Sequence, residues 1–439
     1  MPFQTISKCI TLNFKNMNIL KYSKAIFLFV LISLLWACNQ KTQWEGQEPV
    51  KKVSTRTVPI QLQHKGVFDL GNGVFCSNNF NGARLNGIVL TEDTLITVLI
   101  TSENTPINMS PWYSFKIWSD TIQDIFLKLS YTDGVFHRYF PKLSRDGLNW
   151  QKLDSTKYEE TLITIGENRQ APTDATMHLS IDPDTLWVSA QELITSSQTD
   201  SWTSKIESNS FVTKAKIGES HEGRAINLLK IGKSDDKQII VVLSRQHPPE
   251  VAGFLAMQAF VETICSENKT AKDFRSKYNT YVVPIVNPDG VENGHWRHNK
   301  GGVDLNRDWQ DFNQPETSAI RNFIKQKIDS TGGKLIFFID FHSTWEDIYY
   351  TMKFEEGKGN MPGLVDKMIN LTDQEFPDYK PNIKPSSVNK KHTITSNGHF
   401  ATTYGAEALT YEVGDNTPRD FIRKKAEVSA TKMMELLTK

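Results

Sequence analysis

Hydrophobic and polar positions divide this chain into two parts with different periods. From about 59 to 200, apolar residues alternate with polar ones, as in 113–117 and 125–131, and turn clusters such as 131–134 separate the runs. A period of two indicates strands with one buried face, and several such strands divided by turns favour a sandwich. We therefore expect an antiparallel β-sandwich in this first part.

The second part carries unbroken apolar runs with helical patterns between them. The runs at 239–243, 281–286 and 334–343 are rich in β-branched and aromatic residues, which indicates buried strands. Strands interleaved with helices predict an α/β fold, here a mixed-sheet α/β/α sandwich. The candidate helices are 249–264, 314–328 and 417–437, the last with Pro418 in its first turn.

Candidate metal ligands follow two of these runs. His247 and Glu250 form an H-x-x-E pair directly after 239–243, and His342 lies near the end of 334–343. In open α/β sheets, ligands bind outside the carboxyl ends of the strands. Two imidazoles and one carboxylate make a catalytic zinc set that leaves a fourth position open for water. An H-x-x-E pair alone is weak evidence for a metal site, so the other residues of this second part of the chain have to be considered with it.

Polar residues also gather after the run 281–286. The stretch 287–290 reads Asn-Pro-Asp-Gly, which is ordinary turn chemistry by itself. A glycine- and asparagine-rich surface loop does not explain why Arg297, Asp304, Asn306 and Arg307 follow it so closely.

Together these residues resemble the M14 family of zinc metallocarboxypeptidases, and most of all its cytosolic-carboxypeptidase-like branch. The resemblance covers about 207–439, and the elements occur in the family's order. They are 218–224, His247 with Glu250, 287–290, Arg297, 304–307, 340–343 and 410–412.

The resemblance implies one Zn²⁺ per chain, bound by His247, Glu250 and His342. Asp304 would accept the other ring proton of His247 and so orient that ligand, as metal-bound histidines usually require.

The resemblance also implies the roles of the catalytic and substrate-binding residues. Asn306 and Arg307 would hold the free carboxylate of a peptide's C-terminus, because a guanidinium matches a carboxylate with two hydrogen bonds. Arg297 would stabilise the oxyanion of the tetrahedral intermediate. Glu412 would be the general base. Without this context Glu412 is a strand residue that points outward and Arg307 an ion-paired surface residue. A carboxylate among apolar strand residues is costly to bury unless it has a function.

One position departs from the family. The family carries a mobile tyrosine about twenty residues before the catalytic glutamate, and 390–400 contains none. Tyr404 is close to Glu412 in sequence, and His392 or His399 are candidate substitutes. The zinc-dependent reaction does not require this tyrosine, so its loss bears on substrate handling.

The first residues predict export. An apolar run at 25–37 follows two lysines and precedes Cys38, and its length suits a signal peptide better than a membrane span. The sequence 35–38 resembles a bacterial lipobox in which Cys38 is lipidated; an uncleaved anchor is the alternative. Met17 starts a better-proportioned signal peptide than Met1.

We expect four segments: a signal peptide at 1–37, a lipidated tether at 38–58, a β-sandwich domain at 59–205 and a zinc carboxypeptidase domain at 206–439. The run from 80 to 150 also resembles the domain that precedes the catalytic one in cytosolic-type carboxypeptidases. Such a domain either shapes the substrate entrance or only packs against its neighbour.

The charge balance of the chain limits the classes of partner that it can bind. Basic and acidic residues balance at 50 each, which argues against a nucleic-acid partner. We expect a monomer that binds peptides with a free C-terminal carboxylate and a membrane through its lipid. The basic stretch 380–391 is either a surface loop that keeps the protein soluble or a segment that makes the enzyme favour peptides with acidic ends.

Cys76 and Cys265 either form a disulfide bridge or are two separate buried thiols.

The predicted activity is hydrolysis of the C-terminal peptide bond of peptides or cell-wall stem peptides. The alternatives are an N-acyl amino-acid deacylase of the aspartoacylase kind and an inactive peptide-binding homologue. The Asn-Pro-Asp-Gly turn and the preceding β-sandwich favour the peptidase.

Overall fold

The computed structural model describes residues 53–166, 169–233, 238–388 and 394–439. Of these described residues, 53–163 and 171–439, apart from the gaps just named, belong to one compact unit. The expected sandwich and catalytic parts thus share one unit, and the boundary between 205 and 206 stays a prediction. The signal peptide and Cys38 lie outside the described residues.

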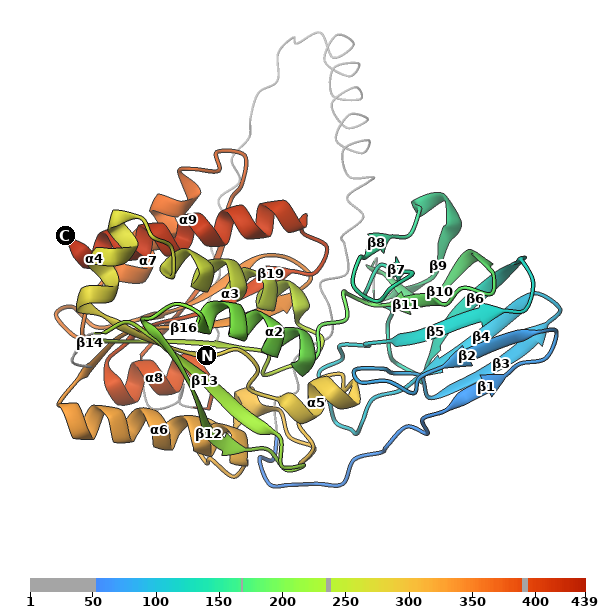
Figure 1. Cartoon of the computed structure of the whole chain (residues 1–439), viewed down its shortest axis with the longest axis horizontal. Coiled ribbons are helices and arrows are strands. Elements are labelled where there is room, and N and C mark those ends of the chain that lie inside the picture. Colours follow the sequence, from blue (N-terminus) through green and yellow to red (C-terminus); the bar gives the residue numbers. More distant parts are fainter. Residues whose placement is uncertain (1–52, 167–168, 234–237, 389–393) are drawn as a thin grey trace, which may run out of the picture. The chain divides into compact units, whose positions relative to one another are not determined.

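Two sheets face each other in the first part (Figure 1), and the apolar residues of the alternating runs form one core between them. The first sheet has the order β1-β2-β5-β11-β7-β8 and the second β3-β4-β6-β10-β9. The pairs β1–β2, β2–β5, β5–β11, β7–β11, β7–β8, β3–β4 and β6–β10 run antiparallel. Strands β4 and β6 run parallel, so the sandwich is not purely antiparallel. The strands are β1 (Val67–Asp69), β2 (Val74–Ser77), β3 (Gly87–Glu92), β4 (Leu95–Ile100), β5 (Ser114–Ser119), β6 (Gln123–Tyr131), β7 (Lys142–Ser144), β8 (Gln151–Lys152), β9 (Tyr158–Ile165), β10 (Arg169–Ile181) and β11 (Leu186–Ser189), with the short 3₁₀ helix η1 (Ser155–Lys157).

The second part is built on a mixed sheet with the order β12-β13-β15-β14-β16-β19-β17-β18. Its central strands β15, β14, β16 and β19 run parallel, which places their carboxyl ends at one edge. The strands are β12 (Val212–Glu219), β13 (Ala225–Ile231), β14 (Gln238–Ser244), β15 (Asn279–Val283), β16 (Lys334–Thr344), β17 (Ile348–Lys353), β18 (Asn382–Ser387) and β19 (Glu407–Gly414).

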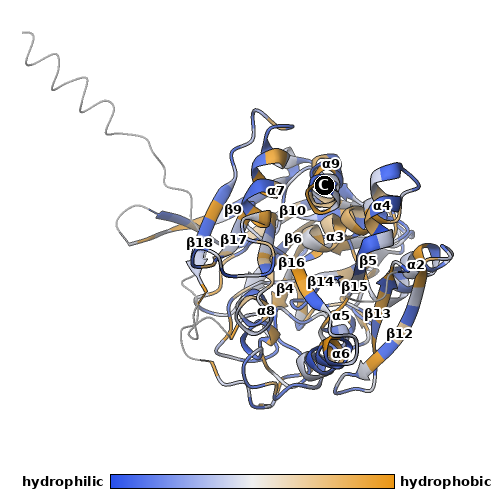
Figure 2. Cartoon of the chain, turned by 90° about the vertical axis from the view of Figure 1, so that its left-hand side faces the viewer, coloured by the Kyte–Doolittle hydropathy of each residue, from blue (hydrophilic) through white to orange (hydrophobic). Residues whose placement is uncertain are grey.

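Helices cover both faces of this sheet, so the expected α/β/α sandwich is confirmed (Figures 1 and 2). One face packs against α2, α3, α4, α7 and α9, and the other against α6 and α8. The helices are α2 (Ser196–Glu207), α3 (Val251–Ile264), α4 (Lys269–Lys277), α5 (Pro288–Asn293), η2 (Leu305–Arg307), α6 (Pro315–Thr331), α7 (Leu364–Asp373), α8 (Ser396–Tyr404) and α9 (Arg419–Thr438).

The expected helices α3, α6 and α9 form within a few residues of their predicted ends. The β pattern assigned up to residue 200 is wrong at its end, where α2 begins. Thr195 and Gln198 close a capping box there. Trp202 and Ile206, one turn apart, pack into the core of the second part. A cap and an i, i+4 apolar pair favour a helix over a strand.

Two further local predictions are refined. The run expected at 281–286 stops being a strand at Val283, because Pro284 lacks the N–H that a ladder needs. Part of the basic loop forms edge strand β18, and Lys390 and Lys391 lie outside the described residues.

Cys76 and Cys265 are separate buried thiols, and burial raises the pKa of Cys265 to about 12. Among the described residues, no helix combines the length and apolarity needed to cross a membrane.

Candidate metal centre and active site

Strand order brings the three expected metal ligands together. β14 and β16 are parallel neighbours, so the loop that follows Ser244 lies beside the end of β16, where His342 stands. Glu250 directly precedes α3, which turns the chain back along the sheet. His247, Glu250 and His342 are all buried, and their ligand atoms lie within 4.8 Å of one another.

The donor atoms converge as a metal site requires. His247 Nδ1 lies 2.8 Å from Glu250 Oε1, and His342 Nδ1 lies 2.7 Å from Glu250 Oε2. The two Nδ1 atoms are 3.2 Å apart. Two imidazole nitrogens and a carboxylate at these separations fit around one ion with ligand distances of about 2.0–2.2 Å. The set therefore suits zinc.

The opposite ring nitrogens are each oriented by a buried carboxylate. His247 Nε2 lies 2.9 Å from Asp304 Oδ1, as the resemblance implied. His342 Nε2 lies 3.0 Å from Asp340 Oδ2. A proton held on each Nε2 leaves each Nδ1 free to bind a metal.

Asp340 was missed as a site residue, although its segment had been recognised. It also accepts hydrogen bonds from Gln246 and Ser396 and is completely buried. Its signal was present in the sequence, since a carboxylate inside the apolar strand β16 is as costly to bury as Glu412 is in β19.

The electrostatics of this cluster favour ionised carboxylates. Burial tends to raise the pKa of Glu250, but the two histidines beside it hold that pKa well below its usual range. For Asp304, burial is likewise outweighed by Arg297 and His247, and its pKa also lies well below the usual range. Burial lowers the pKa of His342, yet Asp340 and Glu250 raise it well above 6.5. A cation at this point satisfies the same carboxylates.

The backbone around the ligands is held by close packing. A Cβ on Gly253 would approach the carbonyl oxygen of His342 to 2.3 Å, so only glycine lets α3 lie against β16 here. The Gly253 N–H also donates to Ser343 Oγ at 2.7 Å. Arg245 has a left-handed φ of 55° just before His247, which is a strained conformation for a non-glycine residue. These contacts fix the direction in which the ligand loop leaves β14.

The Asn-Pro-Asp-Gly turn supports that loop. Asn287 donates from its backbone N–H to the Arg245 carbonyl at 3.1 Å and from Nδ2 to the Gln246 carbonyl at 3.1 Å. Asp289 is completely buried and accepts from Ser220 Oγ and Arg224 Nη1, both at 2.7 Å. The segments 218–224 and 287–290 therefore bind each other, and the second of them also supports the loop that carries His247.

Glu412 faces the same cluster from β19. It pairs in register with His342, so both side chains project from one face of the sheet. Its Oε2 atom is buried and has no hydrogen-bond partner among the described residues. Burial, followed by the charge of Glu250, raises the pKa of Glu412 to about 7, and the two histidines and Arg297 oppose that rise. A carboxylate with this environment can accept a proton near neutral pH.

Arg297 is half-buried beside Asp304, which links it to the metal cluster. Its Nε donates to Asp304 Oδ2 at 2.7 Å, so Asp304 joins Arg297 to His247. Burial lowers the pKa of Arg297, but Asp304 and Glu250 raise it above its usual value overall. Within the described part of the chain, its terminal nitrogens have no hydrogen-bond partner, which leaves them available to a substrate oxygen.

Asn306 and Arg307 differ in how far their side chains are already hydrogen-bonded within the protein. The Asn306 Oδ1 accepts from the Ser396 N–H at 2.9 Å, and its Nδ2 lies 3.5 Å from His342 Nε2. Its side-chain oxygen is thus engaged within the protein, whereas its Nδ2 group cannot donate to a His342 Nε2 that keeps its proton for Asp340. Arg307 is half-buried, donates to the carbonyl of Asn306 at 2.8 Å and forms no ion pair with any described residue. Arg307 is therefore the better placed of the two to receive a carboxylate.

The candidate substitutes for the missing tyrosine do not reach this cluster as far as the structure describes them. His399 lies on α8 and packs against Trp309, Phe312 and Tyr404, and burial lowers its pKa to about 4. Tyr404 also belongs to this aromatic group. His392 lies outside the described residues.

Arg138 from the β-sandwich reaches the site and was not predicted. It donates from Nε to Asp415 Oδ2 at 2.8 Å and from Nη2 to the Ser343 carbonyl at 3.1 Å, next to His342. It is buried, as is Asp415. No local sequence signal marks Arg138, because Asp415 and Ser343 lie more than two hundred residues away from it in the chain.

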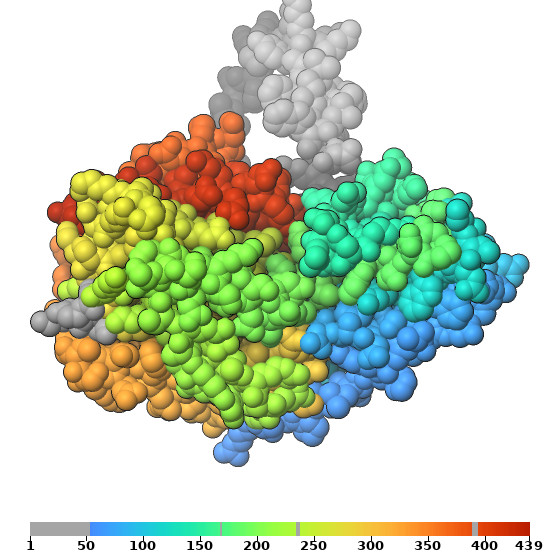
Figure 3. Space-filling model, in the orientation of Figure 1, coloured from blue at the N-terminus to red at the C-terminus, as the bar shows by residue number. Residues whose placement is uncertain are grey.

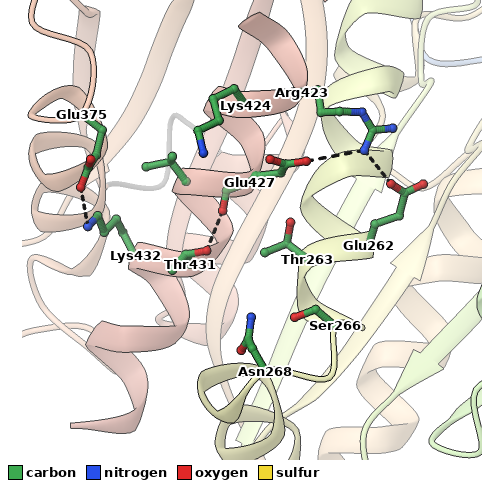
Figure 4. A pocket seen from close by; sticks show the side chains of 11 residues that line it. Glu262, Thr263, Ser266, Asn268, Glu375, Arg423, Lys424, Glu427, Thr431 and Lys432 are labelled. Atoms are coloured by element: carbon green, nitrogen blue, oxygen red, sulfur yellow. Dashed lines mark hydrogen bonds and ion pairs between the residues drawn. The ribbon is translucent and has the colours of Figure 1, made fainter. Parts of the chain in front are cut away.

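A second group of charged residues lines a hollow of about 500 Å³ between α3 and α9 (Figure 4). There Arg423 pairs with Glu262 at 2.9 Å and with Glu427 at 3.6 Å, and Lys432 pairs with Glu375 at 2.9 Å. Of the residues that the structure describes, only His247, Glu250 and His342 form a group that can hold a metal ion. The hollow therefore offers no metal centre.

Comparison with known proteins agrees with this geometry. Residues 199–438 match the family model described as zinc carboxypeptidase, which is more than half of the chain. An uncharacterized protein of Zymomonas mobilis is 24% identical over 320 residues, covering 69% of this chain and 78% of that protein. Cytosolic carboxypeptidase 6 of Caenorhabditis elegans is 27% identical over 152 residues. That match covers 32% of this chain and 33% of the worm protein.

Solved structures share the fold over most of the chain. A metallo-carboxypeptidase from Burkholderia cenocepacia has a TM-score of 0.65 at 16% identity, covering 83% of this chain and 98% of that one. A metallo-carboxypeptidase from Pseudomonas aeruginosa, solved with (2-guanidinoethylmercapto)succinic acid, has a TM-score of 0.64 at 18% identity, covering 82% and 98%. The family match and the converging donor set lead to one conclusion: this chain belongs to the M14 family of zinc carboxypeptidases and carries a metallocarboxypeptidase domain.

Proposed function

We propose that this enzyme removes the C-terminal residue from peptides or from cell-wall stem peptides. His247, Glu250 and His342 would hold one zinc ion. Zinc bound there supplies a Lewis acid that polarises a carbonyl and makes water more acidic. The residues around it then determine which bond is cut.

Glu412 would act as the general base. Its carboxylate has a free, buried acceptor oxygen on the sheet face that carries His342. It would take a proton from the attacking water and deliver it to the leaving amine. Arg297 would donate to the carbonyl oxygen as negative charge develops there, while Asp304 fixes the position of its guanidinium.

Arg307 would make the enzyme an exopeptidase. A guanidinium without an ion-pair partner attracts a substrate carboxylate, and only the last residue of a peptide carries one next to the scissile bond. Asn306 would add a second contact to this carboxylate from its Nδ2 group, since only its side-chain oxygen is engaged, by the Ser396 N–H.

The observation that supports this function most strongly is Glu412, a half-buried residue whose Oε2 atom is buried and unpartnered within the described part of the chain, beside three side chains that can bind a metal. A buried polar atom without a partner is expensive, so the fold retains it for a purpose.

The test uses purified protein supplied with zinc and a panel of peptides that vary in their last residue, together with muramyl stem peptides. Mass spectrometry reads the released amino acids. We expect loss of one terminal residue, and Glu412→Gln should lower kcat by about 10²–10⁴-fold while still binding one zinc. Release of internal fragments, or equal rates for parent and variant, would contradict the proposal. Activity confined to N-acyl amino acids would favour the deacylase.

We also propose that the protein is exported and anchored to a bacterial membrane through a lipid on Cys38. The support is the apolar run at 25–37 with its preceding lysines and lipobox-like ending. Mass spectrometry of the mature N-terminus should find a diacylated Cys38, and Cys38→Ser should release the protein from the membrane fraction. An unmodified Cys38 in membrane-bound protein would disprove lipidation.

A further inference from the structure

A loop of the β-sandwich places a buried carboxylate against the active-site arginine loop (Figure 3 shows the two parts in contact). Glu103 lies in the connection between β4 and β5 and is 0% exposed. Its carboxylate is 194 residues from Arg297 in sequence but lies directly against that residue's backbone.

Glu103 binds three consecutive backbone N–H groups. Oε2 accepts from Trp296 at 2.8 Å, and Oε1 accepts from Arg297 at 3.0 Å and from His298 at 2.7 Å. These bonds fix the peptide planes on both sides of the Arg297 Cα. Because both carboxylate oxygens are used, a neutral side chain of the same shape cannot satisfy all three donors.

The surroundings of Glu103 keep it charged. Arg84 is buried nearby, with its Nε and Nη2 donating to the Thr101 carbonyl at 2.9 and 2.6 Å. Burial tends to raise the pKa of Glu103, but His295, His298, Arg84 and the Trp296 N–H together hold it at about 2. The carboxylate is thus an anion at neutral pH, and its hydrogen bonds are the stronger kind.

Neighbouring residues hold the rest of the same loop without contacting the backbone of Arg297. Asn104 pairs through Oδ1 with His298 Nδ1 at 2.6 Å and donates from Nδ2 to the Gly302 carbonyl at 3.0 Å. Trp296 donates from Nε1 to the Trp112 carbonyl at 3.1 Å. Glu103 and Asn104 are therefore a matched pair. Glu103 contacts the backbone of Arg297, whereas Asn104 contacts only other parts of the same loop.

Arg297 is held at its other end as well, where Nε donates to Asp304. We propose that Glu103 is a positioning residue that sets the Arg297 guanidinium for the oxyanion, so that the β-sandwich completes the active site. The inference rests on the proposed role of Arg297 in peptide hydrolysis. Misplacing such a group by about 1 Å costs up to about 10²-fold in rate.

The test is a double-mutant cycle with Glu103→Gln and Arg297→Ala in the zinc-loaded full-length protein. We expect Glu103→Gln alone to lower kcat by about 10- to 100-fold with little change in KM and with one zinc per chain retained. In the Arg297→Ala background, Glu103→Gln should cause no further loss, because the group that it positions is gone. Asn104→Ala is the matched control and should leave kcat near that of the parent.

Each other outcome overturns the inference in a distinct way. An equal fold-loss in both backgrounds would mean that Glu103 acts on the fold as a whole. An unchanged kcat in Glu103→Gln would mean that Arg297 does not need it. A parent-like Arg297→Ala would remove the proposed role of Arg297 itself. If Glu103→Gln does not fold, Glu103→Asp keeps the charge one carbon further back, and its smaller loss must also vanish without Arg297.

Discussion

Charged side chains gather in two regions of this molecule, at the carboxyl ends of β14 and β16 and in the hollow between α3 and α9. In the first, the side chains of His247, Glu250, Asp304 and His342 are between 1% and 3% exposed. In the hollow, Arg423 is 56% exposed and its partner Glu262 35% exposed. Both regions contain ion pairs at normal distances, so distance alone does not distinguish them.

Burial distinguishes the two regions. Removing charges from water costs several kcal/mol per ion unless the partners and hydrogen bonds are nearly complete. An exposed pair contributes only about 0–1 kcal/mol and needs no further support. In the first region each ligand imidazole has its own carboxylate, and Glu412 keeps an unpartnered oxygen. That combination indicates a site selected for chemistry, whereas the hollow is an ordinary charged surface.

The largest effect should follow from breaking the metal centre. His342→Ala removes one of three ligands, so the protein should lose its bound zinc and its hydrolysis of peptides should fall below detection. In the parent, free zinc at about 1,000 times its Kd should stabilise the fold by about 4.1 kcal/mol, seen as a higher melting temperature. The variant should not respond to zinc. A variant that still binds one zinc tightly would show that these ligands are wrongly assigned.

A smaller effect should follow from removing the carboxylate that orients His342. Asp340→Asn should weaken zinc binding by about 10- to 100-fold, measured by competition with a chelator. Once saturated with zinc, this variant should recover most of its kcat, because Asp340 does not contact Arg297. Asp304→Asn is the informative comparison, since Asp304 holds both His247 and Arg297 and its kcat should stay low at saturating zinc.

The effect of Arg307 should appear in binding. Arg307→Ala removes a charge-assisted hydrogen bond worth about 1.5–3 kcal/mol, so KM should rise by about 10- to 100-fold. Peptides with an amidated C-terminus should be poor substrates for parent and variant alike. If Arg307→Ala impairs the amidated peptides as strongly as the free acids, Arg307 does not bind the terminal carboxylate.

The smallest effect should follow from the hollow. Arg423→Ala breaks an exposed pair, so the free energy of unfolding should change by less than about 1 kcal/mol and kcat/KM should not change. This variant is the control for Arg307→Ala, because both remove one arginine. A large loss of activity in Arg423→Ala would mean that the hollow contributes to function and that burial is a poor guide here.

Much of the fold was predictable from the chain alone. Unbroken apolar runs predicted β14 and β16, and the helical patterns predicted α3, α6 and α9. The prediction failed at α2, whose buried positions 199, 202, 203 and 206 follow a helical period but include two threonines, so that only Trp202 and Ile206 give an apolar signal. The sequence also did not predict that β4 pairs in parallel with β6, because strand partners are chosen by three-dimensional packing.

The sequence by itself predicted which residues form the candidate metal site, because their residue types, order and position after apolar strands are local properties of the chain. It also marked Glu412, through the cost of placing a carboxylate in an apolar strand. Only the tertiary structure decided that Asp340 orients His342, that the side-chain oxygen of Asn306 is engaged by Ser396, and that Glu103 reaches Arg297 from the β-sandwich. The physical reason is that burial and hydrogen-bond partners belong to neighbours in space, and these neighbours lie up to 194 residues apart along the chain.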